Sequence, residues 1–248
     1  MDLPLKRELV ASKSVEQIAS SGPIKMNALT RAYYSAGGGA PGLVVALTSS
    51  FILLYYSNVL GVSAGLVGAA LAAALVFDAF WDPFVGNFSD NFRSRWGRRH
   101  PFMYAAIAPV TLLSFAVWNP PRFLGPVGLA LYLFATIVPL RMFLALFDVT
   151  STALTAELSN DYDERTRLVA YRTTFSWVLI TGISAALYGY WLRDSPAFPN
   201  GLLNPAGYRE MGVATALLIC ATMLICAVGL HPLIPRLQNP AVTHSWRL

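Results

Sequence analysis

Long stretches without charge dominate this chain, and their lengths match membrane spans. No Asp, Glu, Lys or Arg occurs over 32–77, which leaves room for two helices around a polar break at Ser57 and Asn58. A helix needs about 20 apolar residues to cross the hydrocarbon core of a bilayer. Further uncharged stretches, each long enough for one helix, run over 101–121, 123–140, 173–192 and 211–235.

The pattern therefore predicts an all-α integral membrane protein with a bundle of six transmembrane helices over 29–231. We place the helices at 29–57, 62–88, 101–119, 124–156, 168–192 and 209–231. Residues 1–28 are predicted to be a cytoplasmic arm, and 232–248 a cytoplasmic tail or the start of an interdomain linker. The composition agrees, because only 12% of the residues are charged, against about a quarter in soluble domains.

The distribution of Lys and Arg predicts the orientation, because positively charged loops resist translocation. Thirteen of the eighteen Lys and Arg residues fall in the arm, in two loops and in the tail, all on one side of the predicted bundle. Both termini are therefore predicted to be cytoplasmic, in a multi-pass protein of the cell (inner) membrane. The basic residues sit at helix ends, so the pI near 9.4 reflects topology, and no nucleic-acid partner is expected.

The sequence offers no metal or cofactor site. Cys220 and Cys226 both lie inside the last predicted span, and no Cys/His cluster has the spacing of a zinc site. The first predicted span carries Gly37, Gly38 and Gly39. Irregular backbone at membrane depth is tolerated only against protein or a water-filled cavity, so this segment either lines a cavity or packs closely against other helices.

Charged residues inside the spans are the strongest candidates for chemistry. Asp78 and Asp82 are four residues apart, so they stack on one face of a helix. Each costs about 2.5–3.5 kcal/mol at the centre of a membrane helix, and such acids usually mark a route for an ion or a proton. The alternative is that Asp82 is a solvated helix-end residue and that Arg141 neutralises Asp78.

A second set of charges lies on the fourth and fifth predicted spans. Arg141 lies at the same predicted depth as Asp78, so a buried pair is possible. Asp148 follows Arg141 by seven residues, two turns along the same face and about 10.5 Å further inward. Arg172, preceded by Tyr171, opens the fifth span; it is either a snorkelling residue that sets the orientation or part of a polar cavity.

Three motifs carry a family resemblance. They are Asp78-Ala-Phe-Trp-Asp82-Pro83 with the loop that follows it to Pro101, the block from Asp148 to Arg172, and Tyr55-Tyr56-Ser-Asn-Val-Leu-Gly61. These motifs resemble the glycoside, pentoside and hexuronide cation symporter family, also called the melibiose permease family, a branch of the major facilitator superfamily. The likeness covers nearly the whole chain, but only the N-terminal six of the family's twelve helices.

The resemblance implies roles for matched positions. Asp78 and Asp82 fall on the cation site, and Asp148, Tyr171 and Arg172 on the substrate site. The superfamily's cytoplasmic loop signature and gate would comprise Gly86, Asp90, Arg95, Gly97, Arg98 and Arg99, together with the acidic loop of Asp161, Asp163 and Glu164. That acidic loop would close on Arg93, Arg95, Arg98 or Arg99 when the inner gate shuts, or would simply be solvated.

Three positions depart from the family pattern. Trp81 and Ala145 replace residues that offer oxygen ligands, so we expect coupling to a proton rather than to sodium, which prefers a cage of hard oxygens. Gly42 replaces a first-helix acid that grips sugar hydroxyls, which makes a melibiose-like substrate doubtful.

The expected function is cation-coupled symport of a sugar or a related small organic solute, not enzymatic catalysis. Facilitator transporters move their substrate between two six-helix halves, so the chain is expected to be a truncated half. One alternative is a non-transporting half, or one that assembles with another copy. A second is a magnesium-dependent membrane transferase acting on lipid diphosphates, which also uses acids four residues apart; Ser94 stands where a further acid would fall.

Overall fold

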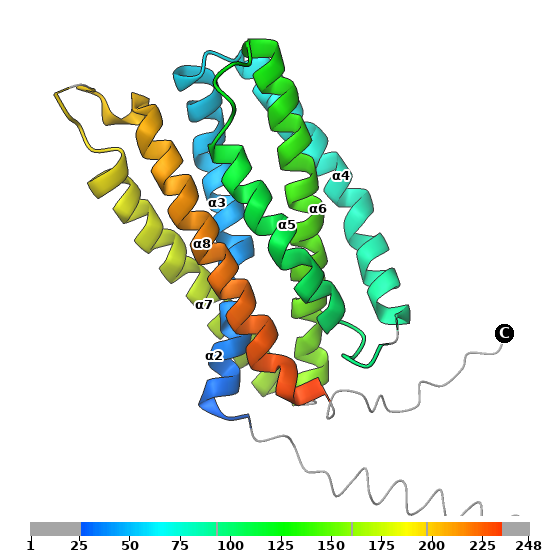
Figure 1. The fold of residues 1–248 in the computed structure, drawn as a ribbon. Coiled ribbons are helices and arrows are strands. Elements are labelled where there is room, and N and C mark those ends of the chain that lie inside the picture. Colours follow the sequence, from blue (N-terminus) through cyan, green and yellow to red (C-terminus); the bar gives the residue numbers. More distant parts are fainter. Residues whose placement is uncertain (1–25, 93, 160, 197, 235–248) are drawn as a thin grey trace, which may run out of the picture.

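The computed structural model describes residues 26–92, 94–159, 161–196 and 198–234. The described residues are almost entirely helical (Figure 1), and their one β pairing is an isolated bridge between Ser195 and Phe198. The prediction of an all-α fold is therefore confirmed. The predicted arm up to residue 25 and the predicted tail from residue 235 lie outside the described residues, and so does Arg93.

The helices follow the predicted order. The first span is composite and consists of α2 (Ala28–Ala36), α3 (Gly39–Leu53) and the π-helical turn η1 (Leu54–Val59). The remaining elements are α4 (Ala64–Asn91), α5 (His100–Trp118), α6 (Pro126–Leu158), α7 (Tyr162–Ala186) with the π-helical turn η2 (Leu187–Trp191), η3 (Gly201–Leu203), α8 (Pro205–Leu230) and η4 (His231–Leu233).

Five segments of the described chain are long and apolar enough to cross a membrane. They are Ala28–Val59, Ala64–Asn91, His100–Trp118, Pro126–Leu158 and Pro205–Leu233. The segment α7 falls short because Arg, Thr and Ser residues interrupt its apolar positions, although its 25 residues would span a bilayer. The sixth crossing therefore stays a prediction.

Side-chain caps explain several helix starts. The hydroxyl of Ser63 accepts a hydrogen bond from the amide of Leu66 at 3.4 Å, and the side chain of Asn204 accepts one from the amide of Ala206 at 3.1 Å. Asp161 caps α7 in the same way, through the amide of Asp163 at 3.0 Å. Such caps satisfy amides that have no partner within the helix.

The helices pack in a curved row whose ends are α4 and α7 (Figure 1). Along the row, α4 packs on α6, α6 on α5, α5 on α8, and α8 on α2 and α3, which in turn carry α7. The start of α2 and the end of α8 lie at the same end of the bundle (Figure 1), as an even number of crossings requires. We call this end the α2 end, and the opposite one the η1 end.

Aromatic side chains close the η1 end of the core. The hydroxyl of Tyr56 donates to the carbonyl oxygen of Val117 at 2.8 Å, and the ring of Tyr55 stacks on that of Tyr208 with 4.7 Å between centroids. All three tyrosines are fully buried. Because a buried hydroxyl must find a partner, these contacts hold η1 against α5 and α8.

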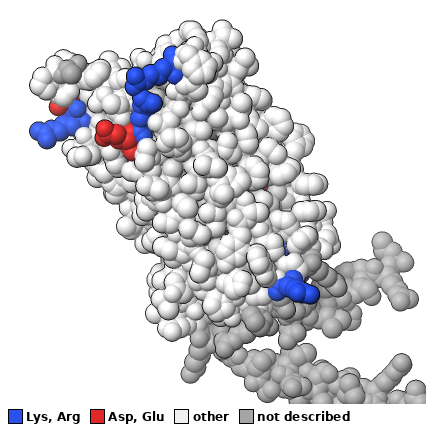
Figure 2. Space-filling model, in the orientation of Figure 1, with Lys and Arg blue, Asp and Glu red and all other residues white. Residues whose placement is uncertain are grey.

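The charged side chains mark the two ends of the bundle. Figure 2 shows Lys or Arg side chains near both ends of the visible face and Asp or Glu side chains gathered near the η1 end, with a broad band of largely uncharged side chains between them. A surface of this kind suits a hydrocarbon environment. Both the distribution of charge on the surface and the lengths of the helices therefore agree with the integral membrane fold that the sequence predicts.

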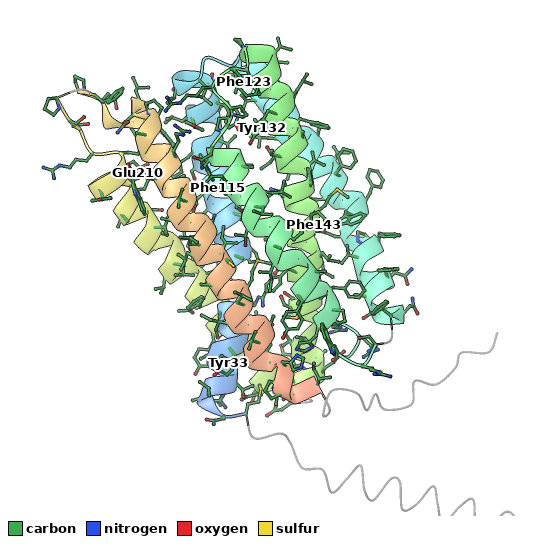
Figure 3. All side chains as sticks on the ribbon, in the orientation of Figure 1. Tyr33, Phe115, Phe123, Tyr132, Phe143 and Glu210 are labelled. Carbon is green, nitrogen blue, oxygen red and sulfur yellow. The ribbon has the colours of Figure 1, made fainter. Side chains whose placement is uncertain are left out.

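Close helix contact at the α2 end depends on small residues. Tyr33 of α2 lies across α8 (Figure 3), at a place where Gly229 carries no side chain and a Cβ would overlap the Tyr33 ring. Small residues let helix backbones approach closely in membranes. This contact sets α2 against α8 on one side, which leaves α6 and α7 as its neighbours on the other.

Candidate functional site

Two acid–arginine pairs join long helices, and α6 contributes one member to each. The first pair joins Asp78 of α4 to Arg141 of α6. The Nε and Nη2 atoms of Arg141 both lie 2.5 Å from Oδ2 of Asp78. The side chains are 17% and 21% exposed respectively, so the pair is largely withdrawn from the surface.

A tryptophan anchors the two helices beside the first pair. The indole Nε1 of Trp81 donates to the carbonyl oxygen of Met142 at 2.8 Å, which ties α4 to α6 beside Arg141. The second carboxylate oxygen of Asp78, Oδ1, is buried and has no hydrogen-bond partner within the described residues. A buried acceptor without a partner is costly, so this oxygen marks a place where a ligand or a proton would be stabilised.

Asp82 lies one turn beyond Asp78 on the same helix and is exposed. Among the residues that the structure describes, none makes a hydrogen bond or an ion pair with Asp82. The charged groups that act on it are Asp78, Asp148 and Arg141. The two sequence-predicted cation-site acids therefore differ, since one is bound to an arginine and the other is open.

The second pair joins Asp148 of α6 to Arg172 of α7. The Nη2 atom of Arg172 donates to Oδ1 of Asp148 at 2.7 Å and lies 3.0 Å from the hydroxyl of Ser151. The Arg172 side chain is 10% exposed, whereas that of Asp148 is 46% exposed. A buried guanidinium thus holds a carboxylate that still faces open space.

An aromatic ring completes the surroundings of Arg172. Its guanidinium carbon lies 5.4 Å from the centroid of the Tyr34 ring, within the range of a cation–π interaction. The hydroxyl of Tyr34 in turn hydrogen-bonds that of Thr155 on α6. Through these contacts α2, α6 and α7 meet around a single buried cation.

The glycines of the first span make room for this arrangement. The chain turns at Gly37 and Gly38, between α2 and α3, and a Cβ on Gly37 would lie 2.6 Å from Nη1 of Arg172. The Ser176 hydroxyl donates to the carbonyl oxygen of Gly38 at 2.6 Å. Of the two interpretations left open by the sequence, the close-packing one accounts for these contacts, and the packed residue is itself charged.

Tyr171 does not share in this cluster. Its side chain is 49% exposed, and no contact joins it to Arg172 or Asp148 within the described residues. Consecutive helix residues point about 100° apart, so the burial of Arg172 turns Tyr171 away from the cluster. Its predicted role in binding gains no support from the geometry.

The charges at the α2 end pair differently from what the acidic-loop hypothesis expects. Arg98 contacts Glu157 at 2.9 Å, and Arg99 contacts Asp90 at 3.0 Å and Glu157 at 3.4 Å. Glu164 instead contacts Arg31 of α2 at 2.9 Å. Arg98 and Arg99 therefore do not close on the acidic loop in this structure, and Asp161 serves as the cap of α7.

Only one of the two signature glycines has a structural reason in the described residues. Gly97 has a φ of +80°, which favours glycine, and its carbonyl oxygen accepts a hydrogen bond from the Ser94 hydroxyl at 2.7 Å. Arg95 belongs to the same loop as Gly97 and is exposed. Gly86 faces α6, where a Cβ would lie 4.0 Å from Val149, an ordinary van der Waals distance, so a side chain would fit there.

Metal-binding clusters are absent from the described part of the chain. No group of three or more His, Cys, Asp or Glu residues lies within reach of one ion there. Cys220 and Cys226 are free thiols. The candidate site therefore consists of carboxylates, guanidinium groups and hydroxyls.

The sequence matches a known protein family. A family model described as MFS/sugar transport protein matches residues 33–243, which is most of the chain. The chain belongs to this family. The match includes both acid–arginine pairs, and it confirms the resemblance to the glycoside, pentoside and hexuronide cation symporters of the major facilitator superfamily.

Individual members of the family are similar over large parts of the chain. An uncharacterised symporter of Synechocystis is 32% identical over 214 residues, covering 84% of this chain and 38% of the relative. A glucuronide carrier protein homolog of Escherichia coli is 31% identical over 139 residues, covering 56% and 30%. The isoprimeverose transporter of Lactiplantibacillus pentosus is 25% identical over 171 residues, covering 68% and 36%.

The chain spans less than two fifths of the length of these three relatives. By their names, these relatives are transporters and symporters and not enzymes. This agrees with the expectation that the chain is not an enzyme and speaks against a magnesium-dependent transferase.

Proposed function

We propose that this chain forms one six-helix half of a cation-coupled symporter for a sugar or a related small solute. The observation that carries the proposal is the presence of two acid–arginine pairs within apolar helices, Asp78–Arg141 and Asp148–Arg172. Ionisable groups at membrane depth are expensive and usually line the path of a solute, an ion or a proton. The family to which the chain belongs, described as MFS/sugar transport protein, independently supports a transport function.

The substrate binds at Asp148 and Arg172. The half-exposed carboxylate offers acceptors for sugar hydroxyls, and the buried guanidinium holds it in place through a contact of 2.7 Å. A site that hydrogen-bonds hydroxyls discriminates strongly against solutes that lack them. The names of two relatives refer to a glucuronide and to isoprimeverose, which supports a sugar or glycoside as the class of solute.

The coupling ion is a proton, carried by the Asp78 and Asp82 carboxylates. Hard metal cations need several oxygen ligands, whereas the residues beside these acids include Trp81, and Ala145 stands on the facing helix. Asp82 is open and has no ion-pair partner among the described residues. A single carboxylate with access to water suffices for a proton.

The second wall of the transport path comes from another six-helix unit, either a further half of the same protein or another copy of this chain. Facilitator-type transporters bind solute at the interface between two halves. Large apolar side chains are exposed on both ends of the helix row, with Phe80 76% exposed on α4 and Trp177 64% exposed on α7.

The protein lies in the inner membrane with both termini in the cytoplasm. This orientation follows from the excess of Lys and Arg in the loops at the α2 end, because positively charged loops resist translocation.

The self-assembling or non-transporting half remains the second candidate, because the same exposed faces would join two copies. The two candidates differ in whether a single copy, together with its other half, moves solute. Measurements of solute uptake, and not of the oligomeric state, therefore distinguish the two candidate functions.

The test is uptake of radiolabelled glucuronide, isoprimeverose and unmodified monosaccharides into vesicles from cells that express the protein. We expect uptake of at least one sugar above that of vesicles without the protein, and its loss in Asp148→Asn and Arg172→Met. Glu210→Gln is the matched control, since Glu210 is exposed on α8 near the η1 end (Figure 3). Absence of uptake for every sugar, or full uptake by both variants, would overturn the proposal.

A further inference from the structure

The guanidinium of Arg141 occupies the side of Asp78 that a free cation would need. Its Nε and Nη2 atoms converge on the single oxygen Oδ2, each at 2.5 Å. Both partners are about four-fifths buried. One elementary positive charge is therefore supplied to this carboxylate by the protein itself.

Trp81 anchors α4 to α6 next to that guanidinium. It donates its indole N–H to the carbonyl oxygen of Met142, the residue after Arg141, at 2.8 Å. This contact fixes α6 against α4 at the level of the Arg141 side chain, so Asp78 cannot easily exchange it for another partner.

The space between the two acids contains no cage for a metal ion. Trp81 lies between Asp78 and Asp82 in the sequence, and its indole is turned toward α6 and against the ring of Phe84, with 5.4 Å between centroids. Of the oxygens on Asp78, only Oδ1 lacks a partner in the described residues. A hard cation would find few ligands there and would meet the repulsion of Arg141.

From this geometry we infer that Arg141 acts as a tethered cation that excludes sodium from the carboxylate pair and so determines the ion specificity of the site. The inference rests on the proposed function and deepens it. Arg141 balances the charge of Asp78, and Asp82 is left as the carboxylate that takes up and releases the coupled proton. Arg141 is a positioning residue: it does not touch the solute, and it acts by filling one ligand position permanently.

The inference predicts a gain of sodium binding when the tethered charge is removed. We would measure binding of radioactive sodium to the purified protein in lipid nanodiscs, with the wild type, Arg141→Met and Arg141→Lys. The wild type and Arg141→Lys should show no saturable site. Arg141→Met should gain one, at least about tenfold tighter than any residual binding by the wild type, and Asp78→Asn in the same background should abolish it.

Folding and sugar uptake are measured separately from sodium binding, so that failure of this inference can be distinguished from failure of the proposed function. Helix content and thermal unfolding show whether Arg141→Met folds. If the Met variant does not fold, Arg141→Gln, which keeps a hydrogen-bond donor, takes its place in the experiment. Saturable sodium binding by the wild type that Asp78→Asn removes, or no sodium binding by the folded Met and Gln variants, would overturn the inference. Loss of the proposed function would instead appear as missing sugar uptake, whatever the sodium result.

Discussion

The two acid–arginine pairs of this protein differ in which partner is buried. In the pair of Asp78 and Arg141 both side chains are about equally withdrawn, at 17% and 21% exposed. In the pair of Asp148 and Arg172 the arginine is buried at 10% exposed, whereas the acid is open at 46%. A closed pair suits a permanent balance of charge, and an open acid on a buried base suits contact with a passing solute.

The neighbours of the two pairs reinforce the difference. Beside the first pair, the indole of Trp81 bonds the backbone of α6. The second is surrounded by the hydroxyls of Ser151 and Thr155 and by the ring of Tyr34. A polar cluster with a free carboxylate edge provides hydrogen bonds to sugar hydroxyls, which the first pair does not.

The largest expected effect is an asymmetry within the second pair. Asp148→Asn leaves the buried Arg172 guanidinium without a counter-charge, so we expect a loss of about 3–5 kcal/mol in unfolding free energy. Arg172→Met removes the buried charge itself and leaves an acid that water can reach, so its loss should be less than half as large. Reversible unfolding in mixed micelles measures both, and equal losses would contradict the asymmetry.

The first pair should behave symmetrically. Asp78→Asn and Arg141→Met each leave one largely buried charge without its partner, and we expect each to lower the unfolding free energy by about 3 kcal/mol. The double variant should recover most of that loss, because it leaves no unpaired charge. Additive losses in the double variant would show that the two groups are not coupled.

A smaller effect is expected where α7 meets the break in the first span. Gly38→Ala places a Cβ 2.6 Å from the Ser176 hydroxyl and 2.7 Å from the backbone oxygen of Arg172, which should cost about 1–3 kcal/mol by overpacking. Gly65→Ala on α4 is the matched control, since nothing lies within 4 Å of its Cβ position. We expect it to be neutral or slightly stabilising. A tolerated Gly38→Ala would mean that α7 can move away from the break.

The smallest effect belongs to the ion pairs at the α2 end. Arg98 is 35% exposed in its contact with Glu157, and pairs of this exposure contribute about 0–1 kcal/mol. Arg98→Gln should therefore leave the unfolding free energy nearly unchanged, because Glu157 keeps its contact with Arg99. If these pairs act as a gate, the same variant should change the rate of solute exchange across vesicle membranes, and an unchanged rate would exclude that role.

The architecture was predictable because membrane insertion imposes a simple rule on the sequence. The gaps between charges predict the same order of long helices as the structure has, with most ends within a few residues, and the common depth of Asp78 and Arg141 follows from counting turns. The start of α7 was less accurate. It begins at Tyr162 and not at residue 168, since the Asp161 cap lets polar residues extend the helix beyond its apolar part.

Other parts of the site carry no such signal. Tyr34, Ser151 and Ser176 are uncharged residues within spans, and neither charge gaps nor helical periodicity separates them from ordinary packing residues. The run of three glycines beside Tyr34 was the available clue, because it indicates a close approach to another element. Glu157 was missed as the partner of Arg98 and Arg99, because pairing between loops depends on the three-dimensional path and not on spacing.

The most direct measurement of the transport mechanism is sugar uptake driven by an imposed pH gradient in wild-type and Asp82→Asn vesicles, with a sodium gradient applied separately. We expect the pH gradient alone to drive accumulation in the wild type. Asp82→Asn should still exchange labelled for unlabelled sugar but should no longer accumulate it. Accumulation by Asp82→Asn at the wild-type rate, or uptake that follows sodium and ignores pH, would contradict proton coupling through the acids of α4.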